Sequence, residues 1–201
     1  MLEQPGRESA GDLPEWHAPP RMIGGHVAGP AVIGRTDGLV VLARQVLAYP
    51  AGLEIEVEAH ARGASPPPGG PLSDPGGFTD PDGFTDPHGF TDPHGFTEPA
   101  QPSFRLRLGD GRVVVQDDEA GLRNGRGPVM VVSGYQAARG GPEDGEDVRL
   151  TLWTWPLPPP GPLALSCAWP ERGLRDATWI LDGAAVRAAA LLARPFWTAG
   201  A

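Results

Sequence analysis

The chain has 201 residues and a net charge of -9, so it can form one large domain or two small ones. Acidic side chains outnumber basic ones, which argues against nucleic acid or an anionic membrane as a partner, because both are bound mainly through Lys and Arg. All 16 basic residues are Arg. A chain without Lys cannot form a lysine Schiff base or the lysine contact of a phosphate-binding P-loop, so these two function classes are excluded.

Three features indicate a soluble, cytoplasmic protein. Cys167 is the single cysteine, so no internal disulfide can form and a reducing compartment is compatible with the sequence. The opening MLEQPGRESAGDLPEW lacks the apolar and positively charged parts of a secretory signal. No run approaches the roughly 18 apolar residues of a membrane-spanning helix.

Residues 1–30 are rich in Gly, Pro and charged residues, with isolated apolar side chains at Trp16, Met22 and Ile23. We expect a mostly irregular N-terminal tail, parts of which can dock on the rest of the chain. The β-branched, apolar run LVVLARQVLAYP, from Leu39 to Pro50, then predicts the first clear strand.

The next segment, GLEIEVEAHAR, shows the clearest alternation in the chain. One set of alternate side chains is apolar: Leu53, Ile55, Val57, Ala59 and Ala61. The other set is polar: Glu54, Glu56, Glu58, His60 and Arg62. A period of two with one apolar side predicts a strand that has one buried and one solvated face, as in an antiparallel sheet.

Alternation returns in SFRLRLGDGRVVV, where Phe104, Leu106 and Leu108 are expected to face inward. The segment Gly109–Gly111 predicts a hairpin turn between two strands. Arg105 and Arg107 would face outward, and we expect them to be cross-strand neighbours of the glutamates in GLEIEVEAHAR.

The remaining strands are expected in PVMVVSGYQ, DVRLTLWTW, LALSCAW and ATWIL, each bounded by Gly, Pro or acidic residues. Asp182 is expected to cap a helix, GAAVRAAALLAR, which Pro195 ends. The sequence therefore predicts an all-β fold, an antiparallel β-sandwich or barrel-like arrangement with one C-terminal α-helix, in a single domain over residues 31–201.

A Pro/Gly-rich segment over residues 63–102 interrupts this domain. Two domains divided at the segment are the alternative, but residues 31–62 offer about three strands, too few to bury a core alone. Because the entropic cost of closing a loop grows only logarithmically with its length, we predict a long disordered insertion in one domain.

Within the insertion, the phrase DPxGFT recurs four times between Asp74 and Pro99. Asp, Pro and Gly stand at the positions favoured in a type I turn, and two copies are identical, which favours a duplicated, solvated loop. A β-helix rung is disfavoured, since it needs stacked aliphatic residues. A weak metal or partner site stays open, with these candidate ligands: Asp80, Asp86, His88, Asp92 and His94. The four Phe of the repeat could pack on the sandwich or on a partner.

Two apolar features elsewhere are candidates for binding. Trp153 and Trp155 share one face of a predicted strand and could stack a sugar or anchor a partner, although burial under neighbouring segments is the commoner role of large aromatics. The following WPLPPPGP contains a PxxP phrase at Pro156–Pro159. Such a phrase can be a ligand for aromatic grooves, but it is more often a rigid crossing between strands.

The sequence offers little for catalysis or for cofactors. Cys167 alternates with Leu165 and Trp169, so we expect a buried, unreactive thiol. His60 has no recognisable nucleophile motif near it. The adjacent acids at 117–119 are typical of a solvated turn, and IGGHVAGPAVIG lacks the spacing of a dinucleotide-binding loop. We predict no cofactor and no metal site.

Three phrases carry a resemblance: PEWHAPP, GRTDGLVVLARQVLAYPAGLEIEVEAHAR and LWTWPLPPPGPLALSCAWPERGL. Together they resemble a widespread family of small all-β actinobacterial proteins, and WPLPPPGPL is the most specific part. The resemblance covers most of the chain outside the repeat. The family carries no established activity, so the resemblance implies only the all-β architecture and a soluble bacterial setting.

We hypothesise a non-enzymatic β-sandwich that binds an unidentified protein in a cytoplasmic assembly. The candidate interaction face consists of Trp153, Trp155, Pro156 and Pro159. The alternative is a sandwich that binds a small ligand or a carbohydrate with the same Trp face. A third hypothesis, a hydrolase that uses His60 with an acid from a neighbouring strand, rests on one residue.

Overall fold

The computed structural model describes residues 16–19, 21–63, 101–117, 121, 124–139 and 145–197. Most of the predicted insertion at 63–102, including the whole DPxGFT repeat, lies outside the described residues. The expected disorder of the insertion and its alternative metal or partner site therefore stay predictions, as does the structure of residues 1–15.

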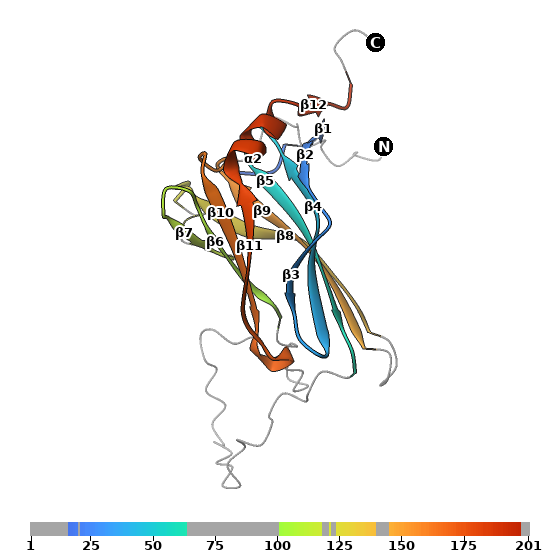
Figure 1. The fold of residues 1–201 in the computed structure, drawn as a ribbon. Helices are drawn as coiled ribbons and strands as arrows, with labels where there is room; N and C mark the ends of the chain where they lie inside the picture. The colour runs from blue at the N-terminus through green and yellow to red at the C-terminus, as the bar shows by residue number, and fades with distance from the viewer. Residues whose placement is uncertain are drawn as a thin grey trace, which may run out of the picture.

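Two antiparallel sheets face each other as a sandwich (Figure 1). The larger sheet has the order β2 (Gly25–Ala28), β4 (Leu39–Ala48), β5 (Leu53–Ala61), β9 (Glu146–Trp155) and β8 (Val129–Arg139), and β3 (Ala31–Arg35) also pairs with β4. The smaller sheet has the order β11 (Leu174–Asp182), β10 (Pro162–Trp169), β6 (Ser103–Arg107) and β7 (Val113–Val115). The predicted all-β sandwich with one helix near the C-terminus is confirmed.

The core lies between the inner faces of the two sheets. The alternation predicted for β5 is confirmed, because Leu53, Ile55 and Val57 are buried and join the core. From the smaller sheet, β6 contributes Phe104 and Leu106, which pack in the same cluster. Since apolar surface removed from water is the main favourable term in folding, this two-sided pattern is what holds the sheets together.

The outward residues of β6 do not meet those of β5, so that expectation was wrong. The predicted hairpin is confirmed, since Arg107 pairs with Val113 across the turn. However, β6 pairs with β7 and β10 in the smaller sheet, whereas β5 pairs with β4 and β9 in the larger one. Arg105 and Arg107 therefore cannot be cross-strand neighbours of the β5 glutamates.

The N-terminal tail is ordered further upstream than predicted. Residues 22–28 were expected to be irregular, but β2 pairs with β4, and β1 (Met22–Ile23) pairs with β12 (Arg194–Pro195). Gly25 allows the C-terminal helix to lie close to β2, because a Cβ at this position would come within 1.8 Å of the Ala189 carbonyl oxygen. The sequence pattern missed these strands because they are short and interrupted by Gly.

The C-terminal helix α2 (Gly183–Ala190) has the predicted cap, since the Asp182 side chain accepts a hydrogen bond from the Ala184 N–H. Its predicted end at Pro195 was wrong. The chain leaves the helix in a turn in which the Leu192 N–H donates to the Ala189 carbonyl. Leu191 and Leu192 are exposed, so further helical turns would bury no apolar face, and the chain instead pairs with β1 as β12.

A buried ion pair joins the two sheets at the end of the sandwich opposite α2. Arg172 follows β10 in the 3₁₀ helix η1 (Pro170–Arg172), and its Nη2 donates to Oε2 of Glu146, the first residue of β9, at 2.7 Å. Both side chains are buried. Arg172 also donates to the Gly63 carbonyl at 3.4 Å, and its guanidinium lies over the Trp169 ring. The pair thus fixes the place where β5 leaves the sandwich.

We predict that Glu146→Gln destabilises the protein by about 3 kcal/mol, because it removes the carboxylate that the buried Arg172 guanidinium contacts at 2.7 Å. Urea unfolding at pH 7 measures the change. The exposed pair between Arg112 and Asp110 offers a matched control, and Asp110→Asn should change stability little. An equal effect of both substitutions would contradict the structural role of the buried pair.

Candidate functional site

The outer face of the larger sheet carries a charged network around Glu58. This residue lies on β5 between Arg149 on β9, its cross-strand partner, and Arg44 on β4. Arg44 Nη1 donates to both carboxylate oxygens of Glu58, at 3.0 and 2.9 Å. Arg149 donates to Oε1 through Nε, at 2.9 Å, and through Nη2. The two guanidinium groups therefore bind the Glu58 carboxylate from the two neighbouring strands.

Glu58 is largely removed from water, although the sequence placed it on the solvated face. Only 7% of its surface is exposed, because the two arginines cover it. Burial alone would raise the pKa of the Glu58 carboxyl, but the hydrogen bonds from Arg149 and Arg44 outweigh burial and lower the pKa below 4.5. Glu58 is therefore ionised at neutral pH.

His60 lies at the edge of this network. Its Nδ1 is 2.8 Å from Oδ1 of Asp147, and its Nε2 is 3.7 Å from Oε2 of Glu58. Two adjoining hollows, of about 510 and 360 Å³, share His60 and Asp147 in their walls. The contact with Asp147 fixes the orientation of the imidazole ring. Asp147 on β9 is thus an acid on a strand next to that of His60, as the third hypothesis requires, and this hypothesis stays a prediction.

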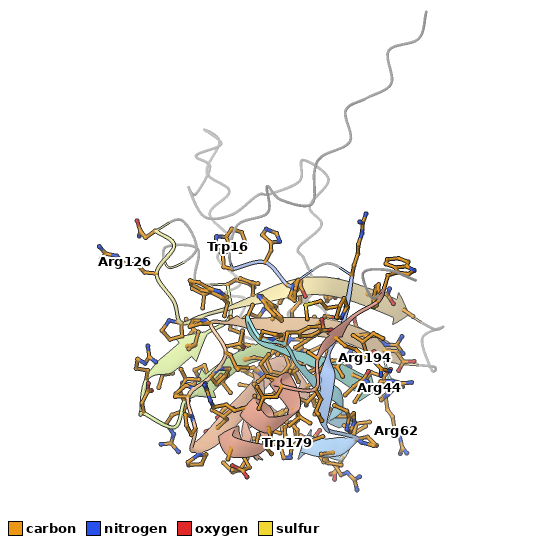
Figure 2. The ribbon with its side chains drawn as sticks, turned by 90° about the horizontal axis from the view of Figure 1, so that it is seen from above. Trp16, Arg44, Arg62, Arg126, Trp179 and Arg194 are labelled. Atoms are coloured by element: carbon orange, nitrogen blue, oxygen red, sulfur yellow. The ribbon has the colours of Figure 1, made fainter. Side chains whose placement is uncertain are left out.

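Trp153 lies on the same outer face, toward the other end of β9, and is only 1% exposed. Its indole Nε1 donates to the Trp16 carbonyl at 2.7 Å, and its ring meets Tyr49 edge-on with centroids 5.7 Å apart. Figure 2 shows Trp16 on the side of the larger sheet that faces away from α2. The interpretation that a neighbouring segment buries Trp153 is confirmed, and the covering segment is part of the N-terminal tail.

A hollow of about 420 Å³ remains beside this contact. Trp16 and His17 border it with rings stacked 4.3 Å apart, and Trp153, Asp117 and Ser133 line it from the sheet side. Asp117 is already engaged, since its Oδ1 accepts from the Val132 N–H at 3.1 Å. The hollow combines aromatic rings with polar groups, as small-ligand sites do.

The other residues of the predicted interaction face lie elsewhere. Trp155 is half-buried at the end of β9, and its ring approaches Gly127 closely enough that a Cβ there would lie 2.9 Å from it. Pro156 is exposed and Pro159 is half-buried in the segment that crosses from β9 to β10, that is, from the larger sheet to the smaller one. Of the predicted interaction face, Trp153 therefore contributes almost no accessible surface, and the binding role of the other three residues stays a prediction.

Cys167 is buried, as predicted, and burial raises the pKa of its thiol to about 12. The thiolate needed for nucleophilic attack or metal binding is therefore scarce at neutral pH. The part of the chain that the structure describes contains no group of three or more His, Cys, Asp or Glu residues arranged to hold a metal ion.

An exposed apolar surface at the α2 end of the sandwich was missed by the sequence analysis. We call it the end cluster, and it consists of Ile23, Leu191, Leu192, Phe196 and Trp197. Leu191 is 86% exposed and Trp197 71% exposed, and the Phe196 and Trp197 rings meet edge-on. The available signal was the Phe-Trp pair directly after Pro195, beyond the predicted helix.

Two exposed arginines border the end cluster. Arg194 pairs with Ile23 between β12 and β1, and the Arg21 carbonyl accepts a hydrogen bond from the Phe196 N–H. Among the residues placed by the structure, neither arginine forms an ion pair with a carboxylate. The end cluster is therefore apolar with a positively charged border.

No family model, curated protein or solved structure matches this chain. The resemblance to actinobacterial proteins accordingly stays a prediction. Among the described residues, no helix is both long enough and apolar enough to cross a bilayer.

The Glu58 network leads to a pH prediction. Because the pKa of Glu58 is lowered in the folded state, its stabilising effect is present above about pH 4.5 and is lost as the pH falls through the lowered pKa. We expect Glu58→Gln to reduce the melting temperature by roughly 5 °C at pH 7 and by progressively less below pH 4.5.

Thermal melts from pH 7 to pH 3 check this expectation. Glu171→Gln is a suitable control, since Glu171 is exposed and has no ion pair within the described residues. A gap between wild type and Glu58→Gln that stays constant across the whole series would show that ionised Glu58 does not stabilise the sheet.

Proposed function

We propose that the chain is a non-enzymatic, cytoplasmic β-sandwich whose end cluster binds a partner protein. The observation that carries this proposal is the gathering of Leu191, Leu192, Phe196 and Trp197, all strongly exposed, on one short stretch of chain. Soluble proteins rarely expose contiguous apolar surface of this kind unless it has a binding role. Trp in particular is enriched at the centres of protein interfaces.

The charges at the border indicate the chemistry of the partner. Arg21 and Arg194 have no carboxylate partner within the described residues, so an acidic segment could bind them without first breaking an ion pair. The apolar centre would accept an aromatic or aliphatic side chain from the same segment. The proposed partner segment is therefore acidic and contains aromatic residues.

The non-enzymatic part of the proposal draws support from His60 and Cys167. Both nitrogens of His60 face carboxylates, and the thiol of Cys167 is buried and protonated. The thiol is therefore not an activated nucleophile, and these contacts of His60 are with carboxylates, not with a hydroxyl or thiol that it could activate.

We expect a photoreactive side chain at Leu191 to cross-link to one partner protein in cells, at an acidic segment that contains aromatic residues. Peptide mapping by mass spectrometry identifies that segment. Changing Arg21 and Arg194 to Glu should reduce the yield at least about tenfold, because like charges would then meet across the interface.

The same photoreactive group at Val113 is the control, since this apolar residue is also exposed but lies outside the end cluster. Equal cross-linking yields from Leu191 and Val113 would reject the end cluster as the binding surface. A yield from Leu191 that does not change when Arg21 and Arg194 are substituted would reject it as well.

The second candidate function is the binding of a small ligand or carbohydrate in the hollow beside Trp16 and Trp153. The stacked rings of Trp16 and His17 favour it, because sugars and planar ligands bind well against aromatic faces. The buried state of Trp153 counts against it, since only part of that indole can reach a ligand.

Titration with a glycan panel, followed by Trp fluorescence, tests this second candidate. We expect saturable quenching that is lost in Trp16→Ala and retained in Trp197→Ala, which removes an exposed Trp outside the hollow. A flat titration across the panel would remove carbohydrates from consideration.

A further inference from the structure

The DPxGFT repeat has acidic and aromatic side chains, which complement the arginines and the apolar residues of the end cluster. From Asp74 to Pro99 the chain contains six acidic residues, four Phe, two His and no Arg. In each repeat a Phe is followed two residues later by a carboxylate, as in Phe84 and Asp86. An aromatic ring and a carboxylate at this short spacing match an apolar surface bordered by arginines.

We propose that the end cluster of one copy of this chain binds the DPxGFT repeat of a second copy. A Phe side chain of the repeat packs against Leu192, Phe196 and Trp197, and the neighbouring carboxylates pair with Arg21 and Arg194. This inference rests on the proposed function, because it assigns the partner of the same surface.

The insertion that contains the repeat joins the sandwich at the end opposite the end cluster. The repeat is attached through Gly63, after β5, and through residue 101, before β6, whereas the end cluster lies beside α2 and the start of β5 (Figure 1). The nine residues of β5 separate the ends by about 30 Å. A chain could bind its own repeat only if both arms of the insertion ran this length, whereas a second copy presents its repeat without that requirement.

An interface between two different surfaces has a structural consequence. Each bound copy still has a free end cluster or a free repeat, so the contact can continue head to tail into chains or closed rings. Four copies of the phrase in each chain also raise the local concentration of binding units next to one cluster, which strengthens the association without new contacts.

Two full-length variants test the proposal, each lacking one half of the contact. In the first, Phe78, Phe84, Phe90 and Phe96 are changed to Ser, so the end cluster is intact. In the second, Arg21 and Arg194 are changed to Glu, so the repeat is intact. Thermal melts confirm that both variants fold before sedimentation velocity is measured over a series of concentrations.

We expect wild type to associate with rising concentration and each variant alone to be monomeric. Their mixture should form a one-to-one complex, because one variant supplies the cluster and the other supplies the repeat. Each set of substitutions should weaken association by about tenfold or more, so that each variant alone is monomeric at the concentrations where wild type associates. Changing Arg105 and Arg107 to Glu, which alters the net charge equally at two exposed positions of β6, should leave wild-type association unchanged.

Three outcomes would overturn the proposal. A wild type that stays monomeric overturns it, even if a synthetic GFTDPHGFTDP peptide binds the four-Ser variant, since that would indicate binding of the repeat within one chain. A mixture that fails to form the complex also overturns it.

If Leu191 nevertheless cross-links to another protein, the proposed function survives and only the assignment of the repeat as its partner fails. The third outcome is that changing Arg21 and Arg194 to Glu leaves association as strong as in the control with Arg105 and Arg107 changed to Glu. The end cluster would then not be the docking surface.

Discussion

The buried ion pair between Arg172 and Glu146 is a specific polar link between the two sheets, in addition to the apolar core that holds them together. It joins the smaller sheet, through η1, to the first residue of β9 in the larger sheet. Two buried charges are tolerated only together, so the pair specifies one relative position of the sheets at this end. The same guanidinium also holds the Gly63 carbonyl, so the point where the chain leaves for the repeat is fixed as well.

The outer face of the larger sheet is covered by arginine side chains toward one end and by aromatic side chains toward the other. Toward the ion-pair end, Arg44 and Arg149 cover Glu58 and leave a polar surface with two hollows. Toward the α2 end, Trp16 and Tyr49 cover Trp153. In both places a side chain on the outer face of the sheet is buried by residues that lie over it, and only for Glu58 had alternation predicted exposure to solvent. This face consequently carries a second, thin layer of packing, whereas the residues of the end cluster are exposed.

Sequence reasoning succeeded where the deciding interaction is local and failed where it is distant. Alternation predicted β5, since each inner residue meets the same core, and Asp182 was recognisable as a cap because it acts two residues away. The arginines that bind Glu58 come from 14 and 91 positions away, so the glutamate row indicated a need for arginines but not which ones. The cover over Trp153 comes from Trp16, 137 positions away, which no local pattern encodes.

The proposed contact also gives a reason for two features that are unfavourable separately. An acidic repeat that served solubility alone would gain nothing from a Phe in every unit, because each exposed ring opposes solubility. Exposed Trp197 and Leu191 likewise oppose solubility in an isolated sandwich. If the rings of the repeat cover the end cluster of another copy, both liabilities are removed in one interface, and the carboxylates neutralise Arg21 and Arg194. Because the insertion joins the sandwich at the end opposite the end cluster, assembly between copies is favoured over closure within one.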